Sequence, residues 1–389
     1  MNQEPWYKIP NFSYKSKNAI IIGGGLAGTS AAFSLARCGW KITLIERNNN
    51  IAQGASGNPA GILMPLISHK DDLLGKFFLS GFDYTLNHIK EIGVNSFDQC
   101  GVLVLESSKV NKNIDDLITA QISEKKTDGI FISKAGWVSP EEICRANINA
   151  YKDNINLITN TEAMTLEKEN DEWVVNDIYK NQIAKSEVVI IANSNDALNF
   201  SQSNWMPLHN VRGQITYLKD YNNEKIKSVI CYDGGYITPE INGICYVGAT
   251  FGVGDNNPKL SINDHKENID NLRNHFDVGS VDYNSLDGRV SFRASSPDRR
   301  PMVSAVACFN SFKQDYFDIC HGRQKKYPDG KYLKGLYISV GHGSRGITSC
   351  PIAGEILAEM ITGKESKLPK NILDILNPAR FIIRKLKRS

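Results

Sequence analysis

A glycine pattern near the start of the chain has the spacing needed to bind a diphosphate. Gly23 permits a tight turn, Gly25 leaves room for a phosphate against the backbone, and Gly28 lets a helix lie close to a strand. The pattern follows an apolar run at residues 19–22 and opens a helical segment at residues 26–37, whose first N–H groups favour phosphate. The sequence therefore predicts an adenine dinucleotide site at this turn. The alternative is a glycine-rich turn in some other βαβ unit.

An acidic residue completes this pattern. Residues 41–45 form a second apolar run that ends in Glu46, whose carboxylate can accept hydrogen bonds from both ribose hydroxyls. Strand, glycines, helix, strand and acid follow in register, which is far more specific than the glycines alone. The residues predicted to bind the dinucleotide in this segment are Gly23, Gly25, Leu26, Ala27, Gly28, Glu46 and Arg47.

Three later segments also end in small residues that suit a ligand. Residues 53–61 are dense in small residues, so backbone and short hydroxyl groups can wrap a ligand closely; a surface loop is the alternative. A buried-type strand is predicted at 187–193, and a glycine turn at 341–347 joins a strand at 336–340 to a helix at 348–361. The candidate cofactor-binding residues of these segments are Gln53, Gly54, Ala55, Ser56, Gly57, Asn58, Ala192, Asn193, Gly343, Ser344, Arg345, Gly346 and Ile347.

The strands predicted for the dinucleotide sheet are interrupted by other patterns. A region of alternating strand patterns, from 211 to 293, separates residues 187–193 from residues 336–340. Such interleaving suits a flavin enzyme better than an NAD dehydrogenase, so we predict an α/β fold with a discontinuous Rossmann-like FAD-binding domain and a second, mostly antiparallel β-sheet substrate domain. The expected boundaries are 1–70, 139–205 and 333–376 for the first domain, 71–138 and 206–332 for the second, and 377–389 for a basic C-terminal segment.

Two helices are predicted outside the glycine segments. Residues 73–92 have apolar side chains at helical spacing, which indicates a buried face. A second helix follows the run Ser139-Pro140, where Ser139 suits the N-cap, Pro140 the first turn and Glu142 the reciprocal capping-box position.

Composition sets limits on the function. The 389 residues suffice for two domains, and a net charge of +3 is too weak to argue nucleic-acid binding by itself. The eight cysteines contain no C-x-x-C pair, which indicates reduced thiols in a cytoplasmic protein, and they form no metal-ligand cluster with the seven histidines. The N-terminal segment lacks the apolar core of a signal peptide, and no run has the length of a membrane span.

The motifs resemble the D-amino-acid oxidase superfamily of FAD enzymes, which includes glycine and sarcosine oxidases. Within it they are most similar to the oxidoreductase half of bacterial bifunctional enzymes that modify the wobble uridine of certain tRNAs. The resemblance runs from Ala19 almost to the C-terminus. The matching stretches are IIGGGLAGTSAAFSLARCGWKITLIE, QGASGNPAGILMPL, GWVSPEEIC, VRGQITYL, RVSFRASSPDRRPMV, LYISVGHGSRGITSCPIAGEILA and NPARFIIRKLK.

The resemblance implies an FAD enzyme that oxidises an N-substituted glycine: the carboxymethylaminomethyl group of a tRNA wobble uridine. It also implies non-covalent FAD, since no cysteine lies near Ser291. Arg293, eight residues before Pro301, matches the carboxylate-binding arginine of the glycine oxidase pattern. The alternatives are that Arg293 makes a structural ion pair, or that Arg299 or Arg300 binds the carboxylate.

The glycine turn at residues 341–347, which precedes the helix predicted at 348–361, is expected to face the flavin. N–H groups at Gly346 and Ile347 can stabilise negative charge during flavin reduction. Arg345 is predicted to add charge or to touch the substrate, with a surface salt bridge as the alternative. His342 is not assigned as a base, because an amine that binds neutral needs none and a histidine in such a turn is more often structural.

The basic C-terminal segment is the remaining candidate site. On a helix, Arg380, Arg384, Lys387 and Arg388 would form one stripe and meet tRNA phosphates; a membrane-surface helix and a merely solvated end are the alternatives. Because the FAD motif begins near residue 20, the methyltransferase half of the bifunctional enzymes is expected to be absent, and methylation to require a separate protein. A small-molecule oxidase of glycine, sarcosine or a D-amino acid and a non-catalytic flavin scaffold are the rival functions.

Overall fold

The computed structural model describes residues 4–67, 72–105, 122–221, 224–321 and 326–388, so parts of the expected domain ranges, and Ser389, lie outside the described residues. The chain forms two compact units, each built from separate stretches of sequence. The first unit comprises Met1–Gln53, Cys144–His209 and Ala294–Ser389. The second unit comprises Gly54–Ile143 and Asn210–Arg293.

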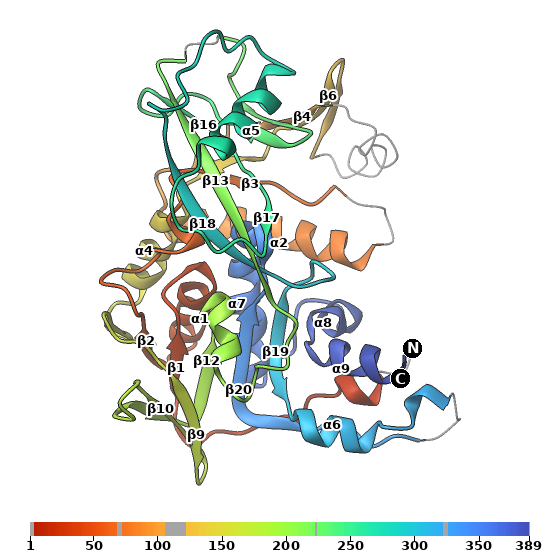
Figure 1. Ribbon diagram of the computed structural model, residues 1–389. Coiled ribbons are helices and arrows are strands. Elements are labelled where there is room, and N and C mark those ends of the chain that lie inside the picture. The colour runs from red at the N-terminus through yellow and green to blue at the C-terminus, as the bar shows by residue number, and fades with distance from the viewer. Residues whose placement is uncertain (1–3, 68–71, 106–121, 222–223, 322–325, 389) are drawn as a thin grey trace. The chain divides into compact units, whose positions relative to one another are not determined.

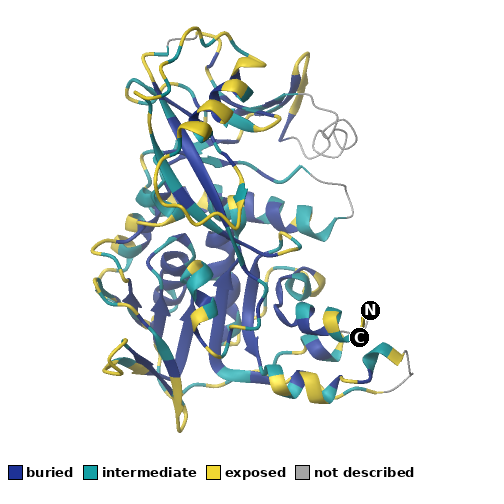
Figure 2. Ribbon diagram, in the orientation of Figure 1, coloured by how far each residue is buried: buried dark blue, intermediate teal, exposed yellow. Residues whose placement is uncertain are grey.

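A six-stranded sheet forms the centre of the first unit (Figure 1). Its order is β19-β20-β12-β1-β2-β8; all neighbours are parallel except β19, which runs antiparallel to β20. The β-branched runs predicted from the sequence are buried on both faces, as parallel strands require (Figure 2). The strands are β1 (Asn18–Ile22), β2 (Lys41–Ile45), β8 (Ile155–Ile158), β12 (Val188–Ile191), β19 (Met302–Ala307) and β20 (Tyr332–Val340).

Two helices that open from glycine turns pack against each other beside this sheet. They are α1 (Leu26–Arg37), which follows β1, and α7 (Gly346–Thr362), which follows β20. A Cβ atom at Gly354 would lie 2.5 Å from the carbonyl oxygen of Ser30, so only glycine allows the two helices this separation. The other elements of the unit are η1 (Pro5–Tyr7), β9 (Thr165–Glu169), β10 (Glu172–Asn176), β11 (Gln182–Ser186), η3 (Ser194–Asn199), α6 (Phe309–Asp315), η4 (Ile319–His321), η5 (Gly343–Arg345), α8 (Lys370–Leu376) and α9 (Ala379–Leu386).

The second unit is built on a larger, mostly antiparallel sheet. Its order is β17-β13-β16-β15-β14-β4-β6-β5, with β18 also paired to β13, and only β14 and β4 are parallel neighbours along this path. The strands are β4 (Val102–Leu105), β5 (Glu124–Lys126), β6 (Gly129–Ile132), β13 (His209–Lys219), β14 (Val229–Tyr232), β15 (Gly235–Ile237), β16 (Ile244–Gly248), β17 (Gly252–Val253) and β18 (Asp287–Ser295). The remaining elements are η2 (Ala55–Gly57), β3 (Gly61–Leu63), α2 (Leu73–Glu91), β7 (Gly136–Val138), α4 (Pro140–Ala150), which contains the unit boundary, and α5 (Ile262–Arg273).

The unit boundaries differ from those expected from the sequence. Residues 294–332 were expected in the second domain, but β19 completes the sheet of the first unit by pairing with β20, and all six of its residues are buried. Residues 54–67 fall in the second unit, and residues 377–388, expected as a separate segment, fall in the first unit. Because all six residues are buried, residues 302–307 lack the alternation of polar and apolar side chains that marks a half-exposed strand in a sequence.

The capping box predicted for α4 is only half formed. The Ser139 hydroxyl accepts a hydrogen bond from the Glu142 N–H at 3.3 Å, as expected of an N-cap. The Glu142 carboxylate instead accepts from the N–H groups of Asn95 and Ser96, at 2.8 and 3.1 Å. The N–H of Ser139 donates to the Ser96 hydroxyl, so Glu142 fixes a neighbouring loop in place of closing the box.

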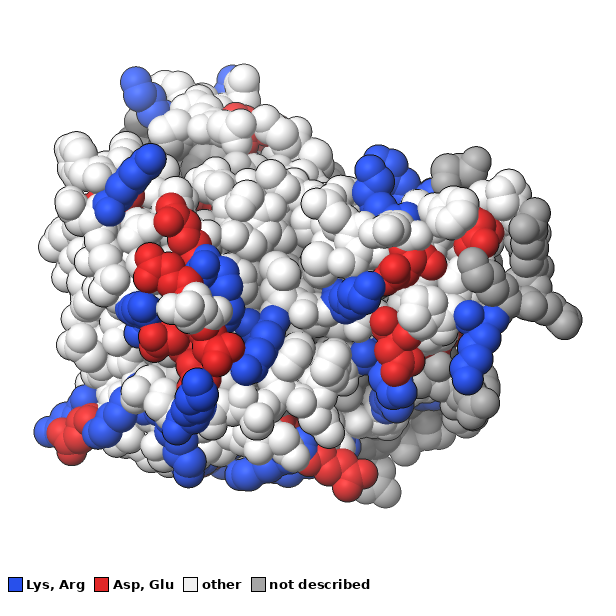
Figure 3. All heavy atoms as spheres, turned by 90° about the horizontal axis from the view of Figure 1, so that it is seen from below, with Lys and Arg blue, Asp and Glu red and all other residues white. Residues whose placement is uncertain are grey.

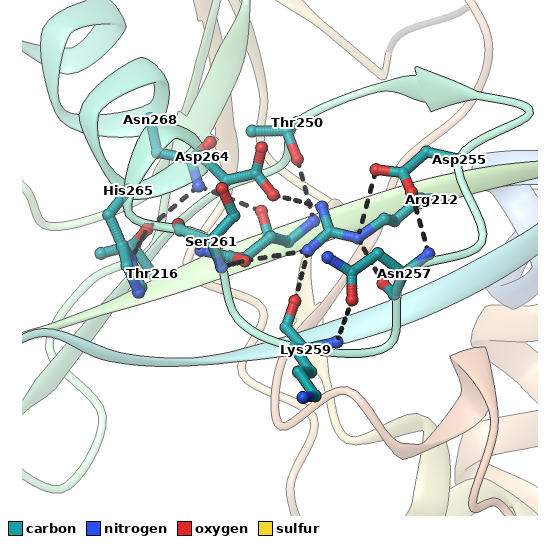
Figure 4. A network of polar contacts seen from close by, with 11 residues as sticks. Arg212, Thr216, Thr250, Asp255, Asn257, Lys259, Ser261, Asp264, His265 and Asn268 are labelled. Carbon is teal, nitrogen blue, oxygen red and sulfur yellow. Dashed lines mark hydrogen bonds and ion pairs between the residues drawn. The ribbon is translucent and has the colours of Figure 1, made fainter.

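A buried arginine joins β13 to the loop before α5 (Figure 4). Arg212 is only 3% exposed; it forms an ion pair with Asp264 and donates to the carbonyl oxygens of Asn257 and Lys259, both at 2.7 Å. Next to it, the Asn268 amide donates to the Thr216 hydroxyl at 3.0 Å. The network anchors the face of β13 that contains Arg212 and Thr216. The alternate residues of the strand point to its opposite face.

We expect Arg212→Met to destabilise the second unit strongly. The change leaves the Asp264 carboxylate and two carbonyl oxygens without their cation, and breaking a buried ion pair typically costs about 3–5 kcal/mol. Urea unfolding monitored by tyrosine and tryptophan fluorescence measures this loss. Lys126→Met is the control, because its ion pair with Glu124 is exposed and should change the free energy of unfolding by less than about 1 kcal/mol. Equal effects of the two changes would contradict a structural role for Arg212.

Candidate functional site

Two of the three motif glycines are required by close approach of the backbone. Gly23 has a φ of +109°, and a Cβ atom there would lie 2.7 Å from the carbonyl oxygen of Ala192. A Cβ atom at Gly28 would lie 1.8 Å from the carbonyl oxygen of Gly23. Gly25 is the N-cap of α1 and has an ordinary φ of −84°, so the backbone alone does not demand glycine there. Its proposed role, leaving space for a phosphate, is separate from these packing roles.

The Glu46 carboxylate is held at the end of β2, beside the glycine turn. It is buried and accepts from the N–H of Gly24 at 2.7 Å and from the N–H and amide of Asn48 at 2.9 and 2.6 Å. The next residue, Arg47, forms an ion pair with Asp196 at 2.8 Å. Gln53 donates through its amide to the Ile51 carbonyl at 3.3 Å. The carboxylate is therefore fixed where the sequence predicted a ribose ligand, whereas the charge of Arg47 is already compensated.

The end of β12 brings a buried acceptor to the same place. The Asn193 Oδ1 atom is buried and has no hydrogen-bond partner among the described residues. Asn193 directly follows Ala192, whose carbonyl lies against Gly23. An unsatisfied buried acceptor costs about 1–3 kcal/mol. A dinucleotide carries hydroxyl and amino donors that can satisfy it, so the residues at this edge fit such a ligand.

The second glycine turn starts α7 at the same end of the sheet. Because β1 and β20 are both parallel to β12, the turns that follow them, and the N-termini of α1 and α7, lie at the carboxyl edge, where open α/β sheets bind ligands. Gly341 and Gly343 have φ values of +74° and +57°, which explains two glycines in this turn. The first turn of α7, which begins at Gly346 and Ile347, contains no acidic residue. The partial positive charge of this helix N-terminus is therefore not offset by a carboxylate of the same turn.

His342 has a structural role in this turn. Its Nδ1 atom lies 2.8 Å from the Ser349 hydroxyl and its Nε2 atom 3.1 Å from the Ser339 hydroxyl. Burial lowers the pKa of His342 to about 4, so the ring is neutral at physiological pH. With both nitrogens bonded to hydroxyls, His342 holds β20 to α7 and is a poor candidate for a general base.

The loop of small residues at 54–58 is anchored by an arginine that the sequence analysis did not single out. Arg289, on β18, donates to the Asn58 amide oxygen at 2.8 Å and to the Gly54 carbonyl at 2.7 Å. Burial lowers the pKa of the Arg289 guanidinium, which remains cationic at physiological pH. Arg289 and Arg293 are four residues apart on one strand and share a face, which is the signal that could have found Arg289.

Arg293 is a desolvated cation without a carboxylate partner in the part of the chain that the structure describes. A Cβ atom at Gly213 would lie 2.3 Å from its Nη2 atom, so glycine at 213 makes room for the guanidinium. Burial lowers the pKa of Arg293, and burial raises the pKa of the nearby Tyr236 to about 12, although the positive charge of Arg293 opposes that rise. The alternative of a structural ion pair has no support among the described residues.

The competing arginines lie elsewhere. Arg299 and Arg300 follow the end of β18 and belong to the first unit, where the Arg300 carbonyl accepts from Arg380 at 2.8 Å. Arg299 is exposed and has a φ of +57°. Neither shares the strand face on which Arg289 and Arg293 lie.

The basic stripe predicted for the C-terminal segment is wrong in part. Arg380 is 4% exposed and forms a two-point ion pair with Asp298, with distances of 3.0 and 3.1 Å. Lys387 lies over the ring of Trp6, 4.8 Å from its centre. The sequence pattern placed Arg380 on the polar face, but Asp298, 82 residues away, pairs with it inside the protein.

Among the described residues, no cluster of three metal-ligating side chains occurs and no helix is long and apolar enough to cross a membrane.

We expect Arg289→Met to release the 54–58 loop and to weaken binding of FAD, the dinucleotide that the resemblance implies. Two hydrogen bonds from a charged group are lost, and each is worth about 1.5–3 kcal/mol, so the dissociation constant should rise by roughly 10-fold or more. Quenching of flavin fluorescence measures the affinity, and limited proteolysis reports cleavage in the loop. Arg289→Lys keeps the charge but reaches only one partner and should lie between the two. Unchanged affinity and unchanged cleavage in Arg289→Met would show that the loop needs no anchor.

Comparison with known proteins places these features in a family. Residues 18–360 match the family described as DAO, FAD dependent oxidoreductase. The chain is 32% identical over 414 residues to the tRNA 5-methylaminomethyl-2-thiouridine biosynthesis bifunctional protein MnmC of Pseudomonas putida, covering 99% of this chain and 62% of that protein. It is 33% identical over 415 residues, with the same coverage, to MnmC of Pseudomonas savastanoi pv. phaseolicola. The chain thus spans about 62% of the length of these relatives.

Solved structures show the same fold. Glycine oxidase from Geobacillus kaustophilus superposes with a TM-score of 0.72 at 17% identity, covering 95% of this chain and 99% of that chain. L-proline dehydrogenase from P. horikoshii gives a TM-score of 0.74 at 19% identity, with the same coverage. The predicted D-amino-acid oxidase-like fold and the FAD cofactor are confirmed. The protein belongs to the DAO family of FAD-dependent oxidoreductases.

Proposed function

We propose that the protein removes the carboxymethyl group of 5-carboxymethylaminomethyl-(2-thio)uridine in tRNA by oxidation. The products are 5-aminomethyl-(2-thio)uridine and glyoxylate. Identity of 31–33% to proteins named for 5-methylaminomethyl-2-thiouridine biosynthesis in tRNA supports the substrate class. The observation that carries the proposal is Arg293, a partly buried cation with no carboxylate partner among the described residues, as expected for a residue whose partner is the substrate.

The substrate is a secondary amine with a CH₂–COO⁻ arm, and its chemistry sets what the protein must supply. The CH₂ group loses a hydride and the nitrogen loses a proton, which leaves a C=N bond; water then cleaves this bond to the primary amine and glyoxylate. When bound, FAD supplies the hydride acceptor. The chain has to bind the carboxylate and hold the CH₂ group in position.

Arg293 suits the carboxylate better than a lysine would. A guanidinium presents parallel N–H groups that match both oxygens of a carboxylate. Gly213 leaves the guanidinium space, and Tyr236 adds a phenol beside it whose pKa burial raises to about 12. A desolvated arginine without an internal partner gains most from an incoming carboxylate, because the ligand restores the missing charge.

Helix α7 and Arg345 complete the proposal. We assign Gly346 and Ile347, at the helix N-terminus, to stabilising negative charge on the reduced flavin. Arg345, directly before them, is proposed to add positive charge. The neutral His342, with both ring nitrogens bonded, takes no part in proton transfer.

The rival function is oxidation of a free amino acid such as glycine or sarcosine. The similarity to glycine oxidase shows only the fold, since its identity to this chain is 17%. Anaerobic reduction of the flavin by modified tRNA, compared with free glycine and sarcosine at saturating concentration, separates the two. Reduction by sarcosine as fast as by tRNA would favour the small-molecule oxidase. A flavin that neither substrate reduces would favour a non-catalytic protein.

We expect Arg293→Ala to lose nearly all flavin reduction while it keeps the fold and bound FAD. Losing one partner of a buried charge pair costs about 2–5 kcal/mol, or roughly 30-fold to several thousand-fold in rate or affinity. Arg293→Lys should recover little, because a point charge cannot bind both oxygens. Stopped-flow reduction under anaerobic conditions is the measurement.

Gly213→Ala is the independent test of the same site. Its methyl group would lie where the Arg293 guanidinium lies, so the arginine must move although it is still present. Reduction should fall in this variant, with normal FAD content as the control for folding. A rate and half-saturation within about threefold of the wild type in both variants, below the roughly 2 kcal/mol expected, would remove Arg293 from the site.

A further inference from the structure

The C-terminal segment concentrates positive charge in a short stretch of the chain. Residues 377–389 contain five basic and no acidic residues, whereas the whole chain has a net charge of only +3. On the face seen in Figure 3, by contrast, acidic and basic side chains are intermingled. The basic residues of the C-terminal segment are therefore candidates for a surface that attracts a polyanion through net charge.

The two sides of α9 have different environments. Ile382 and Ile383 are buried, together with Arg380, which is paired to Asp298. The apolar face of the helix is thus already packed against the protein. A helix that binds a membrane surface needs that face free, so the described packing argues against the membrane alternative.

A groove lies on the outer side of α9. It has a volume of about 400 Å³, is open to solvent, and is lined by Phe381, Arg384, Lys385 and Arg388. Arg384 and Lys385 are three and four residues after Phe381, which places these three on one helix face, and Arg388 follows just after the helix ends. Three cations and one aromatic ring therefore face the same open space, with no acidic residue in the lining.

Arg384 is held in place before any ligand binds. Its Nη2 atom lies 3.0 Å from Asp298, and its guanidinium lies over the ring of Phe381, 5.3 Å from the centre. Burial acts to raise the pKa of Asp298, but the hydrogen bonds and charge of Arg380, with a hydrogen bond from Arg384, outweigh it and lower this pKa to about 2, so the carboxylate stays ionised. One carboxylate shared by two guanidinium groups leaves the cluster with excess positive charge, and Lys385 and Arg388 add to it.

We propose that this groove on α9 binds backbone phosphates of RNA and is a docking surface for the tRNA substrate. The inference rests on the proposed function. An RNA strand presents a closely spaced row of negative charges, which the three cations of the groove can match without base recognition. The stripe predicted from the sequence is thereby redefined: Arg384, Lys385 and Arg388 form it, and Arg380 and Lys387 do not.

The test uses point variants of the full FAD-loaded protein, because truncation at Arg380 would also break its buried pair with Asp298. Lys385→Ala/Arg388→Ala should weaken binding of modified tRNA by at least about tenfold near 0.1 M salt and reduce the log–log salt slope by about two, one for each side chain. Fluorescence anisotropy over a series of KCl concentrations measures both quantities. The rate of flavin reduction at saturating tRNA should stay unchanged.

Lys387→Ala is the matched control, since it removes the same charge from the same helix but on the side facing Trp6. It should change the log–log salt slope by less than about 0.5, which is half the change expected for one phosphate contact. A double variant with wild-type slope, or a control with an equal loss, would overturn the assignment of the groove. Polyglutamate that competes as well as RNA of equal charge would assign it to acidic proteins instead.

The outcomes also separate this inference from the proposed function. The groove alone is overturned if modified tRNA reduces the flavin of the wild-type protein and the double variant binds tRNA with the wild-type affinity and salt slope. Wild-type protein that binds RNA through the groove but is not reduced by the modified tRNA overturns the proposed reaction and leaves the groove standing.

Discussion

The structure of the first unit depends on how closely α1 approaches the strand before it. The Gly23 carbonyl occupies the place where a side chain at position 28 would begin, since a Cβ atom there would lie 1.8 Å away. Any larger residue would push the helix off the sheet and carry its N-terminal N–H groups with it. Gly354 acts in the same way between α7 and α1, where a Cβ atom would lie 2.5 Å from the Ser30 carbonyl. Gly28 and Gly354 thus fix the positions of the two helices whose N-termini are proposed to face FAD.

Two arginines on paired strands of the second unit, Arg212 and Arg293, differ in whether another side chain compensates their charge. Arg212 on β13 is compensated by Asp264 and by backbone carbonyls, and so it secures the loop before α5. Arg293 on β18 has space made for it by Gly213 but no carboxylate partner among the described residues. A buried cation is costly unless something pairs with it. The first arginine therefore suits a structural role, and the second suits a ligand that brings its own negative charge.

The proposed carboxylate site and the proposed docking surface would recognise different parts of the substrate. A carboxylate bound by Arg293 is common to glycine, sarcosine and a carboxymethylamino group on RNA, so that contact alone does not choose among them. Cations on α9 discriminate by size and charge instead, because only a polyanion gains from several weak phosphate contacts at once. Under this proposal, chemistry is selected by the second unit and the macromolecule by a surface of the first.

The sequence by itself determined the features that depend on neighbouring residues. The β1–α1–β2 pattern, the acid at position 46 and the N-cap Ser139 all follow from spacing within a few residues, and the structure has them where they were predicted. Family motifs extended this to the fold class and the cofactor, because glycines and small residues mark places where a backbone must approach something closely.

Only the tertiary structure decided which charges are compensated. Arg380 and Arg293 look alike in the sequence, yet Arg380 finds Asp298 82 residues away, while Arg293 finds no carboxylate among the described residues. Arg289 contacts Asn58 across 231 residues, and no local pattern announces that contact. The edge strand β19 belongs to the first unit because β20 pairs with it. Partners so distant along the chain are set by packing, and periodicity within a segment contains no information about them.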